Sequence, residues 1–128
     1  MTRLTLTLTA LAVSAGMAAA DPLEGTWQTQ PDDGAFAHVT IAPCGANFCG
    51  KIARTFRDGA EYDSPNKGKT LVIDMVPQGG GEYEGSVWRP SNDKIYIGKM
   101  TVNGDALRLR GCVAGGLICA SQNWVRVG

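Results

Sequence analysis

The sequence has one histidine, no net charge and no apolar run long enough to span a bilayer. Its 128 residues contain twelve Lys and Arg against twelve Asp and Glu. This balance indicates no basic patch of the kind that nucleic acids or anionic membranes bind, so we expect no nucleic-acid partner. The single histidine, His38, has no serine on a Gly-x-Ser-x-Gly turn to activate. We therefore predict that the protein is not an enzyme.

Sequence patterns for cofactor and metal sites are also missing. No group of His, Asp and Glu has the spacing of metal ligands. Gly79–Gly81 is glycine-rich, but neither a Lys-Ser/Thr pair nor the start of a helix follows it, as a phosphate-binding loop requires. We expect no cofactor and no metal.

What is present begins with an export signal. Arg3 precedes the mostly apolar run Leu4–Val13, and Ala18–Ala20 form an A-x-A cleavage site. The run is shorter than the ~20 residues that cross a bilayer. The sequence therefore predicts a cleaved signal peptide at residues 1–20 and a single domain at residues 21–128. We expect a periplasmic or secreted protein with no integral membrane segment after cleavage.

Four cysteines in an exported chain indicate disulfide bonds. Cys44 and Cys49 bracket one glycine-containing turn, and Cys112 and Cys119 bracket another. We therefore predict the pairs Cys44–Cys49 and Cys112–Cys119 among the three possible connectivities. The alternative is a four-thiolate zinc site, but the gaps of four and six residues differ from the usual two, and the compartment is oxidising.

Short β-rich runs separated by turn residues follow the signal, with no helical period. Eight runs are predicted as strands: Gly25–Gln30, Ala37–Ala42, Phe48–Phe56, Leu71–Val76, Glu82–Arg89, Lys94–Val102, Ala106–Arg110 and Ala120–Val127. The turns include the strong hairpin signal Asn103-Gly104. Residues 57–70 are polar and form the longest segment expected to be irregular.

Eight antiparallel strands in sequential hairpins predict an all-β, up-and-down barrel, because closure removes exposed strand edges. We expect a monomer whose interior either holds one small ligand or is filled by side chains. An immunoglobulin-like sandwich is the alternative, but its cysteine pair usually bridges distant strands.

The first and last strands are neighbours in such a barrel, and their aromatic residues are candidates for closing one end. Gly25-Thr26-Trp27 opens the first strand and Trp124-Val125-Arg126 ends the last. The pair resembles the lipocalin arrangement, in which the indole of a Gly-x-Trp packs against an arginine near the chain end. We predict that Trp27, Trp124 and Arg126 form a structural plug; the alternative is the floor of a ligand pocket.

One strand face supplies candidates for a ligand pocket. Tyr96, Gly98 and Met100 alternate along the sixth predicted strand, and glycine there leaves room in the lumen. Trp88 is predicted at the rim, beside the turn at Pro90–Asp93. These residues could equally fill the interior.

The wider pattern resembles an exported bacterial family, domain of unknown function 2147. The matching pieces are Gly25–Trp27, Cys49–Ile52, Gly85–Pro90, Lys94–Tyr96, Leu107–Gly111 and Ser121–Arg126. The family's usual Tyr-Asp-Pro is Trp88-Arg89-Pro90 here, and the glycine that follows its next aspartate is absent. The resemblance implies a small lipocalin-like barrel in the periplasm and brings no established reaction.

We hypothesise that the protein binds one small apolar or amphipathic molecule. The alternative is a structural or protein-interaction module of the cell envelope with a filled barrel. An interior void of several hundred cubic ångströms would favour binding.

Overall fold

The structure, a computed structural model, describes residues 20–128. The predicted signal peptide lies outside the described residues, apart from Ala20. The described part consists of β1 (Gly25–Gln28), β2 (Ala35–Cys44), β3 (Asn47–Arg57), β4 (Ala60–Tyr62), β5 (Thr70–Gly79), β6 (Glu82–Arg89), β7 (Lys94–Asn103), β8 (Ala106–Val113), the 3-10 turn η1 (Ala114–Gly116) and β9 (Ile118–Arg126). Within it, no helix has the length and apolar character needed to cross a membrane.

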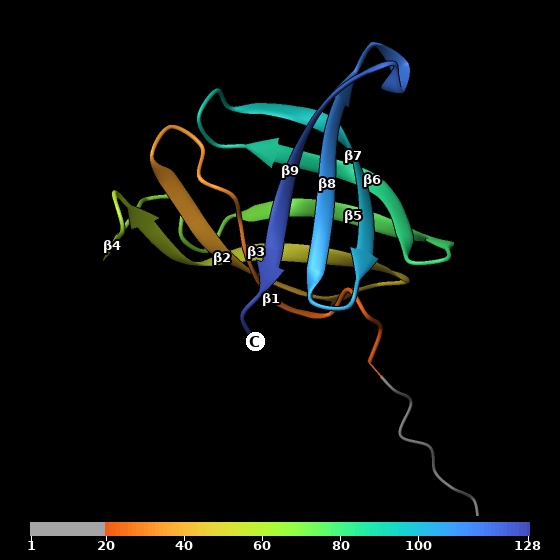
Figure 1. The fold of residues 1–128 in the computed structure, drawn as a ribbon, viewed down its shortest axis with the longest axis horizontal. Coiled ribbons are helices and arrows are strands. Elements are labelled where there is room, and N and C mark those ends of the chain that lie inside the picture. Colours follow the sequence, from red (N-terminus) through yellow and green to blue (C-terminus); the bar gives the residue numbers. More distant parts are fainter. Residues whose placement is uncertain (1–19) are drawn as a thin grey trace, which may run out of the picture.

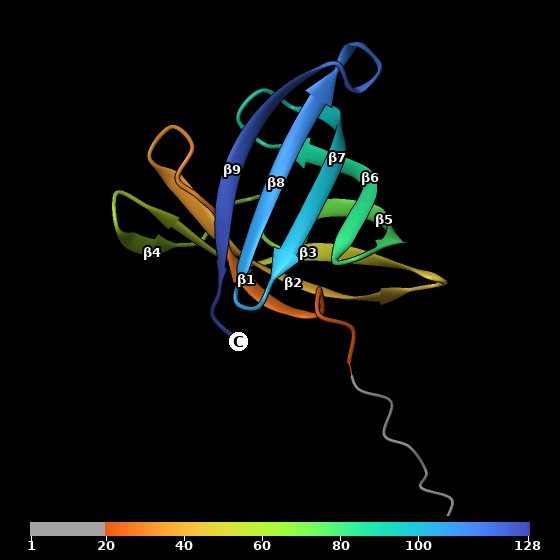
Figure 2. The same cartoon turned by 45° about the vertical axis from the view of Figure 1, so that its right-hand side comes forward.

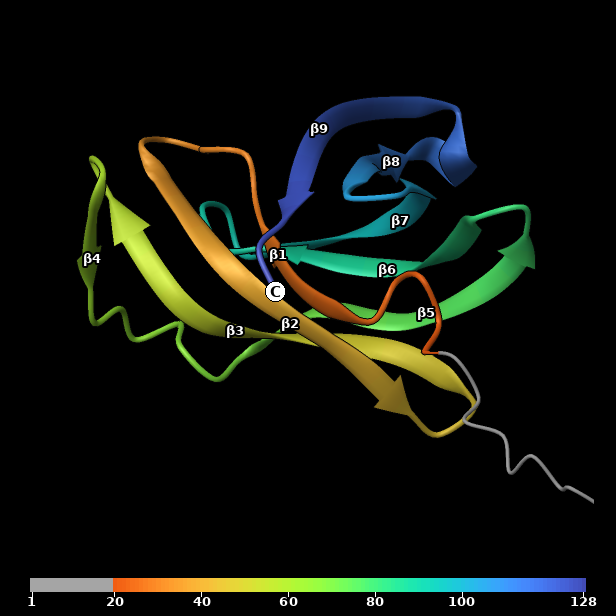
Figure 3. The same ribbon diagram turned by 60° about the horizontal axis from the view of Figure 1, so that its bottom comes forward.

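Eight of these strands form a closed antiparallel barrel (Figures 1 and 3). Around the barrel the order is β1-β2-β3-β5-β6-β7-β8-β9, and β9 returns to β1 through the pairs Trp27↔Arg126 and Gln28↔Val125. Each of these strands therefore has two hydrogen-bonded neighbours, which leaves no open edge in the barrel. The predicted eight-stranded up-and-down barrel is confirmed.

The ninth strand, β4, is a difference from the sequence prediction. It lies within the segment expected to be irregular and extends β3 outside the barrel, with Thr55 opposite Tyr62 and Arg57 opposite Ala60. The two strands are joined by Asp58-Gly59, both in the left-handed region with φ of 50° and 84°. Asp-Gly with positive φ at both positions is a favoured two-residue hairpin turn, so the sequence did carry a signal for it.

The two predicted disulfides are present, and each one staples a hairpin. Cys44 is bonded to Cys49 at the end of the β2–β3 hairpin, with a Cα–Cα distance of 5.7 Å. Cys112 is bonded to Cys119 across β8 and β9, with a Cα–Cα distance of 4.1 Å. No described cysteine is free.

Inward-facing side chains fill one half of the barrel. Trp27, Met75 and Val39 are fully buried there, and Met100 and Leu107 are each only 1% exposed. Leu107 and Leu109 alternate with the outward Arg108 on β8, as the sequence pattern predicts. The other half of the barrel is less densely filled, and it contains the candidate site.

Candidate functional site

Residues 21–24, just before β1, close one end of the barrel. Trp27 lies beneath them, and its indole Nε1 donates to the carbonyl of Leu23 at 2.9 Å. The guanidinium of Arg126 stands 4.3 Å from the centre of the Trp27 ring. It also donates to the carbonyls of Glu24 and Pro22, at 2.8 and 2.6 Å. Arg126 thus holds residues 22–24 across the barrel end and covers the indole.

Tyr83 and Asp21 add a second fastening at the closed end. The Tyr83 hydroxyl donates to the Asp21 carboxylate. Burial raises the pKa of Tyr83 well above its ordinary value, so the phenol keeps the proton that it donates. This contact ties the first residue of the predicted mature chain to the start of β6.

A cavity of about 530 Å³ opens at the other end of the barrel. Apolar side chains from several strands form its lower wall: Ile52, Leu71, Val87, Leu109 and Trp124. Aromatic, polar and charged residues surround its upper part: Tyr62, Trp88, Tyr96, Asn66, Arg57, Arg89 and Asp32. The cavity is therefore apolar in depth and polar at its rim.

Three buried polar side chains line the cavity, and each is already hydrogen-bonded. Thr29, Thr55 and Ser64 are 8%, 6% and 5% exposed. Thr29 Oγ1 accepts from the amide of Ala37 at 2.9 Å. Among the described residues, no buried side-chain nitrogen or oxygen lacks a partner. Each buried polar side chain of the cavity therefore already has at least one protein partner.

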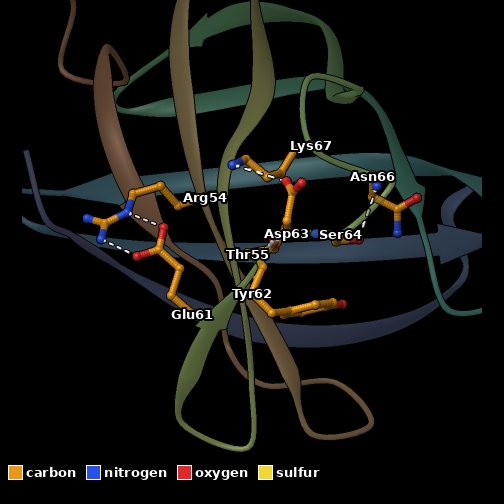
Figure 4. A network of polar contacts seen from close by, with 8 residues as sticks. All are labelled: Arg54, Thr55, Glu61, Tyr62, Asp63, Ser64, Asn66 and Lys67. Carbon is orange, nitrogen blue, oxygen red and sulfur yellow. Dashed lines mark hydrogen bonds and ion pairs between the residues drawn. The ribbon is translucent and has the colours of Figure 1, made fainter.

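Thr55 anchors one side of the rim (Figure 4). Its hydroxyl donates to the carbonyl of Tyr62 at 2.5 Å and accepts from the amide of Ser64 at 3.2 Å. Ser64 Oγ accepts from the amide of Asn66 at 3.0 Å. One buried threonine thus positions the segment that brings Tyr62 and Asn66 to the cavity. Tyr62 is not among the pocket residues predicted from the sequence, because β4 itself was not predicted.

Neighbouring polar and charged groups also affect the acidity of the Tyr62 hydroxyl. The neighbouring Ser64 hydroxyl and the Arg57 guanidinium lower the pKa of Tyr62. The Arg57 guanidinium carbon lies 5.7 Å from the Tyr62 ring centre.

On the outer side, Arg54 and Glu61 form a two-point ion pair with distances of 2.9 and 2.6 Å (Figure 4), which braces β3 against β4.

An ion pair crosses the mouth of the cavity. Arg89 at the end of β6 donates two hydrogen bonds to the Asp32 carboxylate, each 2.8 Å long, and Ser91 Oγ donates to the same carboxylate at 3.2 Å. The β1–β2 loop and the β6–β7 turn lie on opposite sides, with four strands between them in either direction. The pair of Asp32 and Arg89, which we call the mouth strap, therefore joins opposite walls.

The mouth strap should weaken in acid. The hydrogen bonds from Arg89 hold the pKa of Asp32 below its ordinary value. The ion pair therefore contributes its full stabilisation above the pKa that Asp32 has in the unfolded chain. This stabilisation is lost as pH falls through the lower pKa that Asp32 has in the folded protein. Arg89→Gln should raise amide exchange of the β1–β2 loop severalfold at neutral pH and lower Tm only slightly, because the pair is partly exposed.

Hydrogen-exchange mass spectrometry over a pH series checks this prediction. The difference between wild type and Arg89→Gln should shrink as the wild-type Asp32 becomes protonated. Arg54→Gln is the matched control, because it removes the exposed Arg54–Glu61 pair outside the cavity. Equal loop exchange in wild type and Arg89→Gln at neutral pH would show that the strap does not hold the mouth.

The structure separates the four candidate pocket residues into two pairs. Trp88 and Tyr96 line the cavity, and Trp88 Nε1 donates to Asp93 in the adjacent turn at 2.8 Å. Gly98 and Met100 do not line the cavity, and the side chains of Met75 and Val87 occupy the space over Gly98. The sequence pattern put Tyr96, Gly98 and Met100 on one face of β7, but it could not show which of them a side chain from another strand would cover.

The predicted plug residues also lie in two places, the closed end of the barrel and the floor of the cavity. Trp27 and Arg126 are stacked at the closed end, whereas Trp124 faces the cavity from below and is 1% exposed. The Trp124 indole Nε1 donates to Gln122 Oε1 at 2.5 Å. Trp124 thus acts as part of the cavity floor, the alternative that the sequence left open for this group.

Outside the cavity lie two further candidates, His38 as a catalytic group and a cysteine-containing cluster as a metal site. His38 Nε2 lies 3.0 Å from Gln28 Oε1, and its ring packs against Phe56. Burial lowers the pKa of His38, which favours the neutral ring. Cys44, Cys49 and Asp74 form the one group of potential metal ligands among residues 20–128. The disulfide removes both thiolates, so this group does not suit a metal.

Comparison with known families identifies the family of the chain. A family model described as an uncharacterized protein conserved in bacteria, DUF2147, matches residues 25–126. The chain belongs to this family. The match begins at the start of β1 and ends at the last residue of β9, so family membership covers the whole barrel. No curated protein matches the sequence.

Among solved structures, protein HP1028 from the human pathogen Helicobacter pylori, described as belonging to the lipocalin family, is similar to this DUF2147 member. The TM-score is 0.67 and the sequence identity 17%, over 86% of this chain and 85% of that chain. At this identity the likeness concerns the fold. It agrees with the lipocalin-like barrel that the strand pairing shows.

Proposed function

We propose that this protein is an exported binding protein that holds one small amphipathic molecule in the cavity at the barrel mouth. The observation that carries the proposal is the cavity of about 530 Å³. Small-molecule sites commonly have volumes of ~300–1,000 Å³, with mostly apolar walls and few polar groups. The two disulfides, which oxidising compartments allow to persist, support export.

The distribution of polar groups supports an amphipathic ligand. The lower wall is apolar and its buried polar neighbours are already paired, so an apolar group is favoured there. At the rim, Arg57 and Asn66 remain near solvent and can meet a polar head. The ligand would thus lie with its apolar part downward, against Trp124 and Leu109.

Binding accounts for the geometry better than catalysis or a filled interaction module. The one histidine contacts Gln28 and Phe56, not a serine or cysteine nucleophile. Side chains fill the closed half of the barrel, but the upper half retains the cavity. We accordingly propose a non-catalytic role.

A substitution at Gly111 tests the binding proposal. Gly111 lines the cavity, and a Cβ added there would lie 3.7 Å from Tyr96 Cβ, which is ordinary contact. Gly111→Leu should therefore extend into open space without a clash. Native mass spectrometry of protein taken from its own periplasm should show a co-purifying small molecule in wild type and lose it in Gly111→Leu. Affinity for the fluorescent amphiphile anilinonaphthalene sulfonate should fall about tenfold or more.

Gly128→Leu is the matched control, because its Cβ would stand 3.5 Å from Thr26 at the closed end. It should leave the adduct and probe affinity unchanged, and both variants should melt close to wild type. A wild-type protein that carries no adduct and binds no amphiphilic probe would contradict the proposal. Unchanged probe binding by a folded Gly111→Leu variant would place the site outside the cavity.

A further inference from the structure

An exposed apolar tip projects beside the cavity mouth. It consists of Val113, Leu117 and Ile118, at the end of the β8–β9 hairpin, and we call it the hairpin tip. Leu117 is 86% exposed, Ile118 65% and Val113 45%. In Figures 1 and 2 this hairpin extends beyond the other loops at its end of the barrel. Leu117 is far more exposed than a leucine that contributes to a folded core.

The hairpin tip is stiffly supported and free of charge. Val113 pairs with Ile118 one step beyond the cross-strand disulfide of Cys112 and Cys119, so the apolar pair sits on a stapled ladder. Residues 111–125 contain no charged side chain. An apolar projection held in place loses little conformational freedom when it is buried by a partner.

Basic side chains lie behind the tip. The Lys99 ammonium is 3.1 Å from the position that a Cβ on Gly116 would take, so it sits directly beneath the 3-10 turn. Lys99 is paired in register with Arg110, the last charged residue before the tip. Glu84 is the acidic neighbour of Lys99, on β6, the side away from the hairpin. The nearest charges along β8 and beneath the turn are therefore positive.

The shape and size of the tip decide which partner it fits. Three partly exposed side chains cannot supply the ~800 Å² that each partner buries in a standard protein interface. A projecting tip needs no complementary surface if the partner is a fluid apolar layer. Apolar residues at the end and cations behind them match the acyl chains and anionic headgroups of a phospholipid bilayer.

We propose that the hairpin tip inserts into the surface of a phospholipid bilayer, with Lys99 and Arg110 at the level of anionic headgroups. Gly111 and Ala120, the pair just below the disulfide, line the cavity. Insertion therefore holds the mouth next to the bilayer, where an amphipathic molecule can pass between lipid and cavity. The zero net charge of the chain gave no sign of this, because insertion depends on three side chains and local charges.

Vesicle sedimentation tests the proposal with the disulfide-bonded protein. Wild type should co-sediment with vesicles of phosphatidylcholine and phosphatidylglycerol, and less with phosphatidylcholine alone. In the double variant Leu117→Ser with Ile118→Ser, the affinity for the mixed vesicles should fall by about tenfold or more. The matched control is Val125→Ser with Val127→Ser, because these valines are 50% and 46% exposed near the opposite end. It should bind like wild type.

Fluorescence shows where the lipid contact lies. Leu117→Trp should give an emission shift to shorter wavelength when mixed vesicles are added, and bromine-labelled lipids should quench it. Near-ultraviolet circular dichroism establishes that each variant is folded. The proposal is overturned if wild type binds neither vesicle, if the tip variant binds as wild type does, or if the control loses binding equally. It is also overturned if sedimentation velocity shows a dimer that the tip variant abolishes, since a second copy would then cover the tip.

Discussion

Replacing Trp27 by alanine should lower the free energy of unfolding by about 3–5 kcal/mol, as expected for removal of a large buried aromatic. Trp27 is fully buried, and its indole donates a hydrogen bond to Leu23 in the segment that covers the closed end of the barrel. Without the indole, Arg126 loses the ring beneath it and the carbonyl of Leu23 loses its donor. Urea unfolding followed by circular dichroism measures the change.

Two further variants separate the contributions to this effect. Trp27→Phe keeps an aromatic ring but leaves the Leu23 carbonyl unpaired, which costs about 1–3 kcal/mol for a buried group. Arg126→Ala should destabilise by less than Trp27→Ala, through lost stacking and lost contacts to Pro22 and Glu24. If the three variants unfold at the urea concentration of wild type, Trp27 and Arg126 do not close the barrel.

The sequence predicted the barrel because its strands repeat a local signal. Alternation of Leu107 and Leu109 with Arg108 and Arg110 defines an inner and an outer face, and Asn103-Gly104 defines a hairpin. Such signals depend on residues close together in the chain. The same reasoning identified the short-range disulfides, since each pair closes one turn.

The candidate site was only partly predictable, because its contacts join residues far apart in the sequence. Asp32 and Arg89 are 57 positions apart, and no local pattern relates them. Tyr62 reaches the cavity through β4, whose Asp58-Gly59 turn was present in the sequence but lay in a segment too polar to be recognised as strand. A family resemblance with no known activity could not supply these contacts.

The alternation of residues along a strand also cannot show which inward-facing residues line the cavity. Tyr96 and Met100 point to the same face of β7, yet Tyr96 lines the cavity and Met100 is packed at 1% exposure. What separates them is the set of side chains that arrives from other strands. At Gly98, between the two, that space is taken by Met75 of β5 and Val87 of β6.

Gly98→Leu should therefore destabilise the fold rather than block the cavity. A Cβ at Gly98 would lie 2.7 Å from Met75 Cε and 2.9 Å from Val87 Cγ1, both closer than real Cβ contacts. Met75 is fully buried and Val87 is 5% exposed, so neither can move into solvent. Overpacking of this kind costs about 1–3 kcal/mol, and a branched four-carbon side chain should reach the upper end of that range. Urea unfolding measures the stability of Gly98→Leu, and Gly111→Leu, which should unfold close to wild type, is measured beside it for comparison.

Met75→Ala provides the internal control for this prediction. On its own it removes a buried side chain and should cost about 2–5 kcal/mol. Combined with Gly98→Leu it makes room for the new leucine, so the double variant should be more stable than the sum of the single changes predicts, by up to about 3 kcal/mol. Additive costs would mean that the introduced leucine and Met75 do not compete for one space. A Gly98→Leu protein with wild-type stability and no ligand binding would extend the cavity down to this level, and the filled half of the barrel would then begin below Gly98.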